Sequence, residues 1–201
     1  MNTEMEYGEV FQGITGWAPH DWQAQLGAAA ECDNRLIRIP TGLGKTEGVL
    51  AAWLFHAVAR QQPSWPRRLV WCLPMRVLVE QTAERCRKII ERWAQVNSID
   101  ESDRPRVHIL MGGEDTDRWW LQPERPAVLV GTQDMLLSRA LNRGYASARA
   151  RWPMEYALLN QDCLWVMDEV QLMDVGLATS AQLQAFRDQD RSEQHFGKET
   201  N

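Results

Sequence analysis

A heptapeptide near the start of the chain has the residue types that bind phosphate, and it reads Pro40-Thr41-Gly42-Leu43-Gly44-Lys45-Thr46. Its two glycines let backbone N–H groups approach phosphate oxygens, and a helix that begins here adds the positive end of its dipole. We expect Lys45 to reach the β- and γ-phosphates and the Thr46 hydroxyl to bind Mg²⁺. Ile39 replaces the usual first glycine. A plain helix-opening turn would leave the Lys-Thr pair unexplained, so the heptapeptide predicts nucleotide binding.

Two adjacent acids, Asp168 and Glu169, directly follow the apolar segment 164–167. Ligands gather at the carboxyl ends of strands in a parallel α/β sheet. We therefore expect Asp168 to face the Mg²⁺ held by Thr46, and Glu169 to position and polarise the attacking water. An acidic pair after a strand is also typical of a solvated helix cap, and the phosphate-binding sequence is what favours the catalytic interpretation.

Short apolar segments alternate with helical patterns along the chain and would position these residues. We expect strands at 36–39, 69–73, 107–110, 127–130 and 164–167, and helices at 46–59, 77–93, 135–141 and 176–187. Apolar runs without polar alternation are typical of strands buried on both faces. Cys72 in the second strand and Cys163 directly before the last are expected to be small buried side chains. Interleaved with helices, these strands predict an α/β fold with a mostly parallel, doubly wound sheet.

The composition is that of a soluble globular protein. Of the 201 residues, 44% are apolar and 24% are charged, which excludes intrinsic disorder of the whole chain. No apolar run approaches the roughly 20 residues that span a bilayer, and the N-terminal residues lack a signal-peptide core. We therefore expect a cytoplasmic protein without a membrane partner. A net charge of −5 argues against nucleic-acid binding by bulk positive charge, although a local basic strip remains compatible with it.

The motifs, taken in order, resemble those of superfamily 2 helicases. Asp168-Glu169-Val170-Gln171 resembles their D-E-x-H/Q box, and the segment 40–46 resembles their motif I. Further resemblances are to the glutamine motif at 19–23, motif Ia at 73–81, a double glycine at 112–113 and the G-T-x-D motif at 131–134. The resemblance runs from about Gly16 to Gln184, which is most of the chain.

This resemblance implies a RecA-like P-loop domain with ATP and Mg²⁺ as cofactors. The implied ATP-binding residues are Gln23, which would read the adenine edge, and Thr41, Gly42, Leu43, Gly44, Lys45 and Thr46. The implied metal-binding residues are Thr46 and Asp168. The implied catalytic residues are Lys45, Asp168, Glu169 and Gln171.

A nucleic-acid contact is expected from motif Ia, the double glycine, the G-T-x-D motif and an arginine run. The residues assigned to it are Arg76, Gly113, Thr132, Arg139 and Arg143. Arg139, Arg143, Arg149 and Arg151 follow one another with no acid between them, a pattern that suits backbone contacts and is equally typical of a solvated helix and loop. Trp119 and Trp120 offer rings for base stacking, but we favour the packed base of a loop.

Within the superfamily, the sequence is most similar to the helicase part of the CRISPR-associated helicase–nuclease of type I systems. The features are Gly-Lys-Thr-Glu at 44–47, the G-T-x-D motif, Leu-Met-Asp after the D-E box, and the Arg-rich segment before it. This similarity implies an ATP-dependent helicase that acts on single-stranded DNA in CRISPR antiviral defence, with a CRISPR effector complex as a candidate partner. Other DEAD/DEAH-type ATPases are the alternative.

We expect an N-terminal lead with the glutamine motif over 1–35, a RecA-like ATP-binding lobe over 36–188 and a polar tail over 189–201. The family's second lobe with its arginine fingers, its S-A-T strand and its nuclease domain have no counterpart in this sequence. The expectation is therefore a first lobe of a larger protein or a truncated copy, with a separate second lobe as a candidate partner. The alternative function is a nucleotide-binding module without helicase turnover, so the enzymatic activity of the chain stays open.

Overall fold

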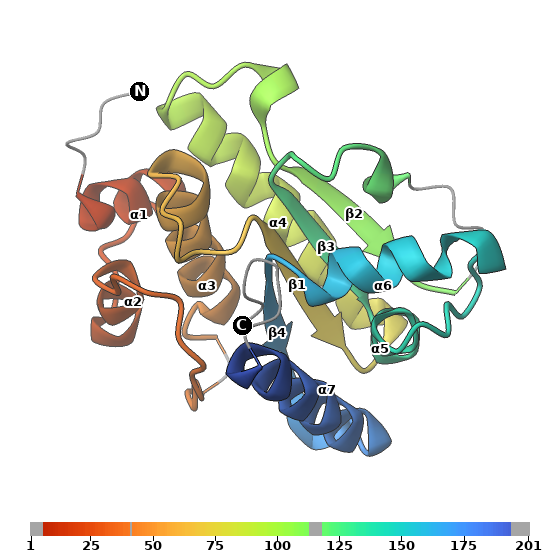
Figure 1. The fold of residues 1–201 in the computed structure, drawn as a ribbon. Helices are drawn as coiled ribbons and strands as arrows, with labels where there is room; N and C mark the ends of the chain where they lie inside the picture. Colours follow the sequence, from red (N-terminus) through yellow and green to blue (C-terminus); the bar gives the residue numbers. More distant parts are fainter. Residues whose placement is uncertain (1–5, 41, 113–117, 194–201) are drawn as a thin grey trace. The chain divides into compact units, whose positions relative to one another are not determined.

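The computed structural model of the chain describes residues 6–40, 42–112 and 118–193, and Figure 1 shows its ribbon. The chain forms two compact units. One contains Met1–Trp65 and Glu84–Arg106, and the other contains Pro66–Ala83 and Val107–Asn201. The long helix α4 (Arg76–Val96) supplies residues to both, so the chain passes from one unit to the other within a regular element.

The unit with Pro66–Ala83 is built on a four-stranded parallel sheet whose order is β2-β3-β1-β4. The register aligns Cys72 with Gly131 on one side and with Met167 on the other, so the carboxyl ends of three strands lie at one edge. The α/β class that the sequence predicts is confirmed. The strands are β1 (Arg68–Leu73), β2 (Arg106–Leu110), β3 (Ala127–Thr132) and β4 (Cys163–Met167).

Three helices accompany this sheet: α5 (Gln133–Ala140), α6 (Trp152–Asn160) and α7 (Val175–Ser192). Helix α5 contacts both of the others, and α5 and α6 also contact strands. Cys72 and Cys163 are fully buried in the core between these elements, which confirms their interpretation as small core side chains. Burial, followed by the charge of Asp134, raises the pKa of Cys72 to about 12, so its thiol stays protonated at neutral pH.

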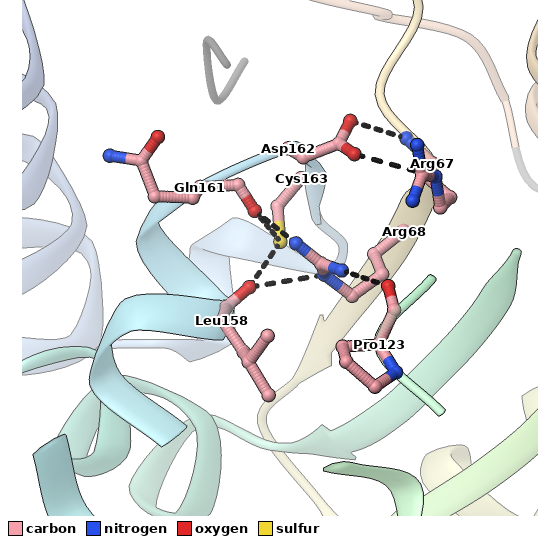
Figure 2. Close-up of polar contacts among 7 residues, drawn as sticks. All are labelled: Arg67, Arg68, Pro123, Leu158, Gln161, Asp162 and Cys163. Atoms are coloured by element: carbon pink, nitrogen blue, oxygen red, sulfur yellow. Dashed lines mark hydrogen bonds and ion pairs between the residues drawn. The ribbon is translucent and has the colours of Figure 1, made fainter. Parts of the chain in front are cut away.

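The amino edge of the sheet is tied together by one buried guanidinium (Figure 2). Arg68, the first residue of β1, donates to the backbone oxygens of Leu158 at 3.1 Å, Pro123 at 2.9 Å and Gln161 at 2.5 Å. These carbonyls come from α6, from the segment before β3 and from the segment before β4. Because charge-assisted hydrogen bonds are the stronger kind, Arg68 fixes three chain segments at the edge opposite the predicted chemistry.

Asp162 reinforces the same edge from its position just before β4. Its Oδ1 accepts a hydrogen bond from the Arg67 backbone N–H at 2.8 Å, and its Oδ2 lies 3.6 Å from Arg67 Nε (Figure 2). Its own backbone oxygen accepts from the Arg68 N–H at 3.1 Å. The backbone of Asp162 is left-handed, with φ of 56°. The start of the β1–β4 pairing is therefore fixed by side chains as well as by the ladder.

The unit with Met1–Trp65 is helical in the part that the structure describes. Helix α3 packs against both α1 and α2. Tyr7 meets Phe55 edge-on, with ring centroids 5.4 Å apart, and His56 stacks on Trp65 at 4.3 Å. Burial lowers the pKa of His56, so its ring is neutral at pH 7. The elements are α1 (Tyr7–Thr15), α2 (Asp21–Gly27), α3 (Lys45–Trp53) and the π-helical η1 (Leu54–Ala59), joined by the later turns of α4.

The predicted strand at 36–39 is wrong. The structure assigns no regular element to residues 32–40, and Leu36 is 88% exposed. A strand needs a neighbour that satisfies its N–H and C=O groups, and the four strands of the described sheet all come from later in the chain. The predicted helix at 46–59 is present, as α3 followed by η1.

In the residues that the structure describes, we find no helix with the length and apolar character that crossing a bilayer requires.

Candidate functional site

The phosphate-binding sequence forms a glycine turn that leads into α3. Gly42 has a φ of 88° and Gly44 a φ of 69°, backbone conformations that side chains with a Cβ rarely adopt. Gly44 is the N-cap of α3, and Lys45 and Thr46 begin the helix half-buried. The first N–H groups of a helix have no partner within it, so this end of α3 can bind an anion. Thr41 lies outside the described residues.

Gln23 links the glutamine motif to this turn. Its side chain is only 2% exposed; Oε1 accepts from the His20 backbone N–H at 2.8 Å, and Nε2 donates to the Gly44 backbone oxygen at 3.0 Å. Both polar ends of the amide are therefore engaged inside the unit. The structure thus brings Gln23 to the phosphate loop, a contact that the sequence does not predict, while its predicted contact with adenine stays a prediction.

The sequence did not reveal an ion pair that the structure places beside the loop, between Glu47 and Arg85. Glu47 Oε1 accepts a hydrogen bond from Nε of Arg85 on α4, and its other oxygen, Oε2, is buried without a hydrogen-bond partner among the described residues. The available signal was the position of Glu47, since an acid at the third residue of a helix often caps its start.

Asp168 is held at the carboxyl edge of the sheet by three hydrogen bonds. Its N–H donates to the Cys72 backbone oxygen at 3.1 Å, which extends the β1–β4 ladder by one residue. Its Oδ2 accepts from Trp71 Nε1 at 3.2 Å, and its Oδ1 accepts from the Glu169 N–H at 3.0 Å. The carboxylate is thus oriented by β1 and by its own turn, and it is only partly buried.

Glu169 and Gln171 interact within the D-E-x-Q box. Glu169 has a left-handed backbone, with φ of 54°, and this bend ends the strand. Gln171 Nε2 donates to Glu169 Oε2 at 2.5 Å, so the amide orients the carboxylate. A non-glycine residue with positive φ is held there by its surroundings, and such strain occurs often at functional sites.

The residues assigned to catalysis belong to different units. Lys45 and the phosphate loop lie in the unit with Met1–Trp65, and Asp168, Glu169 and Gln171 lie in the other. Each group is locally ordered by its own contacts.

Two of the motifs assigned to nucleic acid meet in the sheet-containing unit. Arg76 is exposed at the start of α4, and a Cβ placed on Gly112 would overlap its guanidinium. The missing Cβ at 112 therefore leaves room for the end of the Arg76 side chain beside the backbone there. Gly113 lies outside the described residues. Motif Ia and the double-glycine segment thus present one cationic group to solvent.

The arginine run divides into structural and exposed members. Arg139 is fully buried, with Nε 3.6 Å from Oε2 of Glu155, which is also fully buried. This corrects the expectation that Arg139 contacts nucleic acid, because its charge is neutralised inside the unit. Arg143 is exposed as expected. Thr132 is 8% exposed at the end of β3, so its side chain offers little surface to a ligand.

The tryptophans near this run pack rather than face solvent. Trp119 is 4% exposed and belongs to the core of the sheet-containing unit, which confirms the packed-loop interpretation for that residue. The guanidinium of Arg151 lies 4.2 Å from the ring centre of Trp120, a cation–π contact, and its Nε lies 3.8 Å from Glu155 Oε1. Arg151 therefore also belongs to the structure of the loop.

Family comparison supports the motif analysis over most of the chain. The profile of the DEAD/DEAH box helicase family matches residues 21–195. The chain belongs to this family. It is therefore an ATP-binding lobe of the helicase type, and helicase domains bind nucleic acid. No curated protein matches the chain.

Arg139 and Arg143 should give opposite results when each is changed to alanine. Arg139→Ala removes one half of a buried ion pair and should lower the free energy of unfolding by about 3 kcal/mol. Arg143→Ala should change it by less than about 0.5 kcal/mol and should instead weaken single-stranded DNA binding and reduce its salt dependence. Urea unfolding and a DNA titration at two salt concentrations measure both. A stable Arg139→Ala protein with lost DNA binding would restore Arg139 to the nucleic-acid site.

Proposed function

We propose that this chain is the ATP-binding lobe of an ATP-dependent helicase that tracks along single-stranded DNA. The observation that carries the proposal is the ordered D-E-x-Q box: three hydrogen bonds fix Asp168 at the end of β4, and Gln171 orients Glu169. In a solvated helix cap, the carboxylate would not need hydrogen bonds from the protein to both of its oxygens, as Asp168 has.

The nucleotide phosphates are assigned to the loop. Gly42 and Gly44 give its backbone the required left-handed turns, and the start of α3 supplies donors and a positive dipole. Lys45 is proposed to neutralise the β- and γ-phosphates, with Thr41 and Leu43 completing the loop. Gln23 is proposed to read adenine, and its bond to Gly44 would make the loop sensitive to the base.

The metal is assigned to Thr46 and Asp168. A hydroxyl and a carboxylate are the hard oxygen donors that Mg²⁺ prefers, and each oxygen of Asp168 keeps a lone pair beyond the hydrogen bond that it accepts. Bound Mg²⁺ would neutralise charge that develops on the phosphates. Glu169 is proposed to accept the proton of the attacking water, with Gln171 holding its carboxylate in position.

The nucleic-acid surface is assigned to Arg76, Gly113 and Arg143, without the buried Arg139 and Thr132. Arg76 and Arg143 supply exposed positive charge, and contacts of this kind go to the phosphate backbone and carry no base sequence. Such binding suits an enzyme that moves along a strand of any sequence.

The finer assignment is to the CRISPR-associated helicases of type I systems, in the cytoplasm. It is supported by Gly44-Lys45-Thr46-Glu47, by the G-T-x-D motif and by Leu-Met-Asp after the D-E box. A second helicase lobe, in the same polypeptide or in another, would supply the arginine fingers, and a CRISPR effector complex is the proposed partner.

The second candidate function is a nucleotide-binding module that does not turn over ATP. The matched motifs favour it, because they are those of the first helicase lobe, and in this family the arginine fingers that hydrolysis needs lie on the second lobe. An ATPase assay on the 201-residue chain, with and without single-stranded DNA, measures the turnover. We expect a trace of hydrolysis that DNA raises little, since an arginine finger contributes about 10³–10⁵ to the rate in related enzymes. Robust DNA-stimulated turnover would rule out the module and would show that these residues suffice.

Nucleotide binding itself has a direct test. Mg-ATP at a hundredfold excess over Kd should stabilise the chain by about 2.7 kcal/mol, which is roughly 5–10 °C in Tm for a domain of this size. Lys45→Ala should abolish the shift. Lys88→Ala is the matched control, because Lys88 pairs on the helix surface with Glu84. An unchanged Tm of the wild-type chain at millimolar Mg-ATP, or an equal shift in Lys45→Ala, would count against the site.

A further inference from the structure

Glu47 and Arg85 give the phosphate loop a feature that nucleotide binding alone does not require. Glu47 is the third residue of α3, and Gly44 is the N-cap of the same helix. Arg85, on α4 and in the same compact unit, binds one carboxylate oxygen. The other oxygen is buried and has no hydrogen-bond partner among the residues described. A buried carboxylate oxygen without a donor is costly, so its position calls for an explanation.

The unpartnered oxygen lies beside Gly44 of the loop. A Cβ built on Gly44 would lie 3.5 Å from Oε2 of Glu47. In a capping box, an acid at the third helical position accepts a hydrogen bond from the backbone N–H of the N-cap residue. Glu47 thus has the position from which it could cap Gly44, while the structure shows it paired with Arg85.

The same backbone donors serve nucleotide binding. Phosphate at a helix N-terminus accepts hydrogen bonds from the first N–H groups and from the loop that precedes them. A carboxylate in the first turn is stabilised by the same dipole and repels the phosphate charge. Glu47 and a nucleotide phosphate therefore have opposing demands on Gly44 and on the start of α3.

We propose that Glu47 is a built-in competitor of nucleotide phosphate, and that Arg85 keeps the loop receptive by holding its carboxylate. Both are positioning residues, and the proposal rests on nucleotide binding by the loop. Arg85 is 58% exposed and Glu47 is 18% exposed. The holding group can therefore be removed at the surface without opening the core.

The test is a double-mutant cycle on the full chain, read out as the Kd of a fluorescent ADP with Mg²⁺. Arg85→Ala should weaken binding roughly two- to fivefold, because it releases Glu47 to the loop. Glu47→Ala should tighten binding by a similar factor, and Arg85→Ala should then have no effect in the Glu47→Ala background. Glu47→Gln, which keeps the side-chain size and removes the charge, should also tighten binding.

Lys88→Ala is the matched control for Arg85→Ala, since it removes the same charge from the same helix but from a pair with Glu84. It should leave the Kd unchanged. Weakened binding in both Arg85→Ala and Glu47→Ala, with lowered Tm values, would overturn the proposal and make the pair a structural tie. Wild-type binding that is absent, or that survives Lys45→Ala, would contradict the proposed function itself, so the two failures are distinguishable.

Discussion

The parallel alignment of β1 with β3 and β4 is the constraint on which the proposed chemistry depends. Because Cys72 is in register with Gly131 and Met167, three strands end at one edge, and the residues that follow them share it. The bond from the Asp168 N–H to the Cys72 oxygen carries this alignment directly into the D-E box. Slippage of β4 by one residue would turn Asp168 to the other face of the sheet.

The amino edge of the sheet has the stabilising contacts, and the carboxyl edge has the residues assigned to the proposed chemistry. At the amino edge, Arg68 holds three carbonyl groups and Asp162 fixes the start of the β1–β4 pair. At the carboxyl edge, Glu169 has a left-handed backbone, and the carboxylates there remain partly exposed. The partly exposed carboxylates thus lie at one edge, and the dense charge-assisted bonding lies at the other.

Sequence patterns predicted the features that depend on neighbouring residues in the chain. They missed the features that depend on contacts between segments far apart in the sequence. Apolar runs predicted the four strands that pair, and the glycine spacing predicted a loop that leads into a helix, which the structure forms with Gly44 as the N-cap of α3. The same kind of run at 36–39 forms no strand, because periodicity carries no information about a neighbour to pair with. The sequence pattern predicted that Arg139 is a surface charge, and this was wrong. Its buried partner Glu155 lies 16 residues away and becomes its neighbour only because α5 packs against α6.

The central claim is that Asp168 serves the metal and Glu169 serves the water, and the Mg²⁺ dependence of ATP binding tests it most directly. Mg-ATP titrations of the Asp168→Asn and Glu169→Gln chains should separate the two roles. Asp168→Asn should weaken binding in Mg²⁺ and make it nearly independent of the metal, because the charge that holds the ion is gone. Glu169→Gln should bind as the wild type does. Lost binding in Glu169→Gln, with intact Mg²⁺ dependence in Asp168→Asn, would contradict the account.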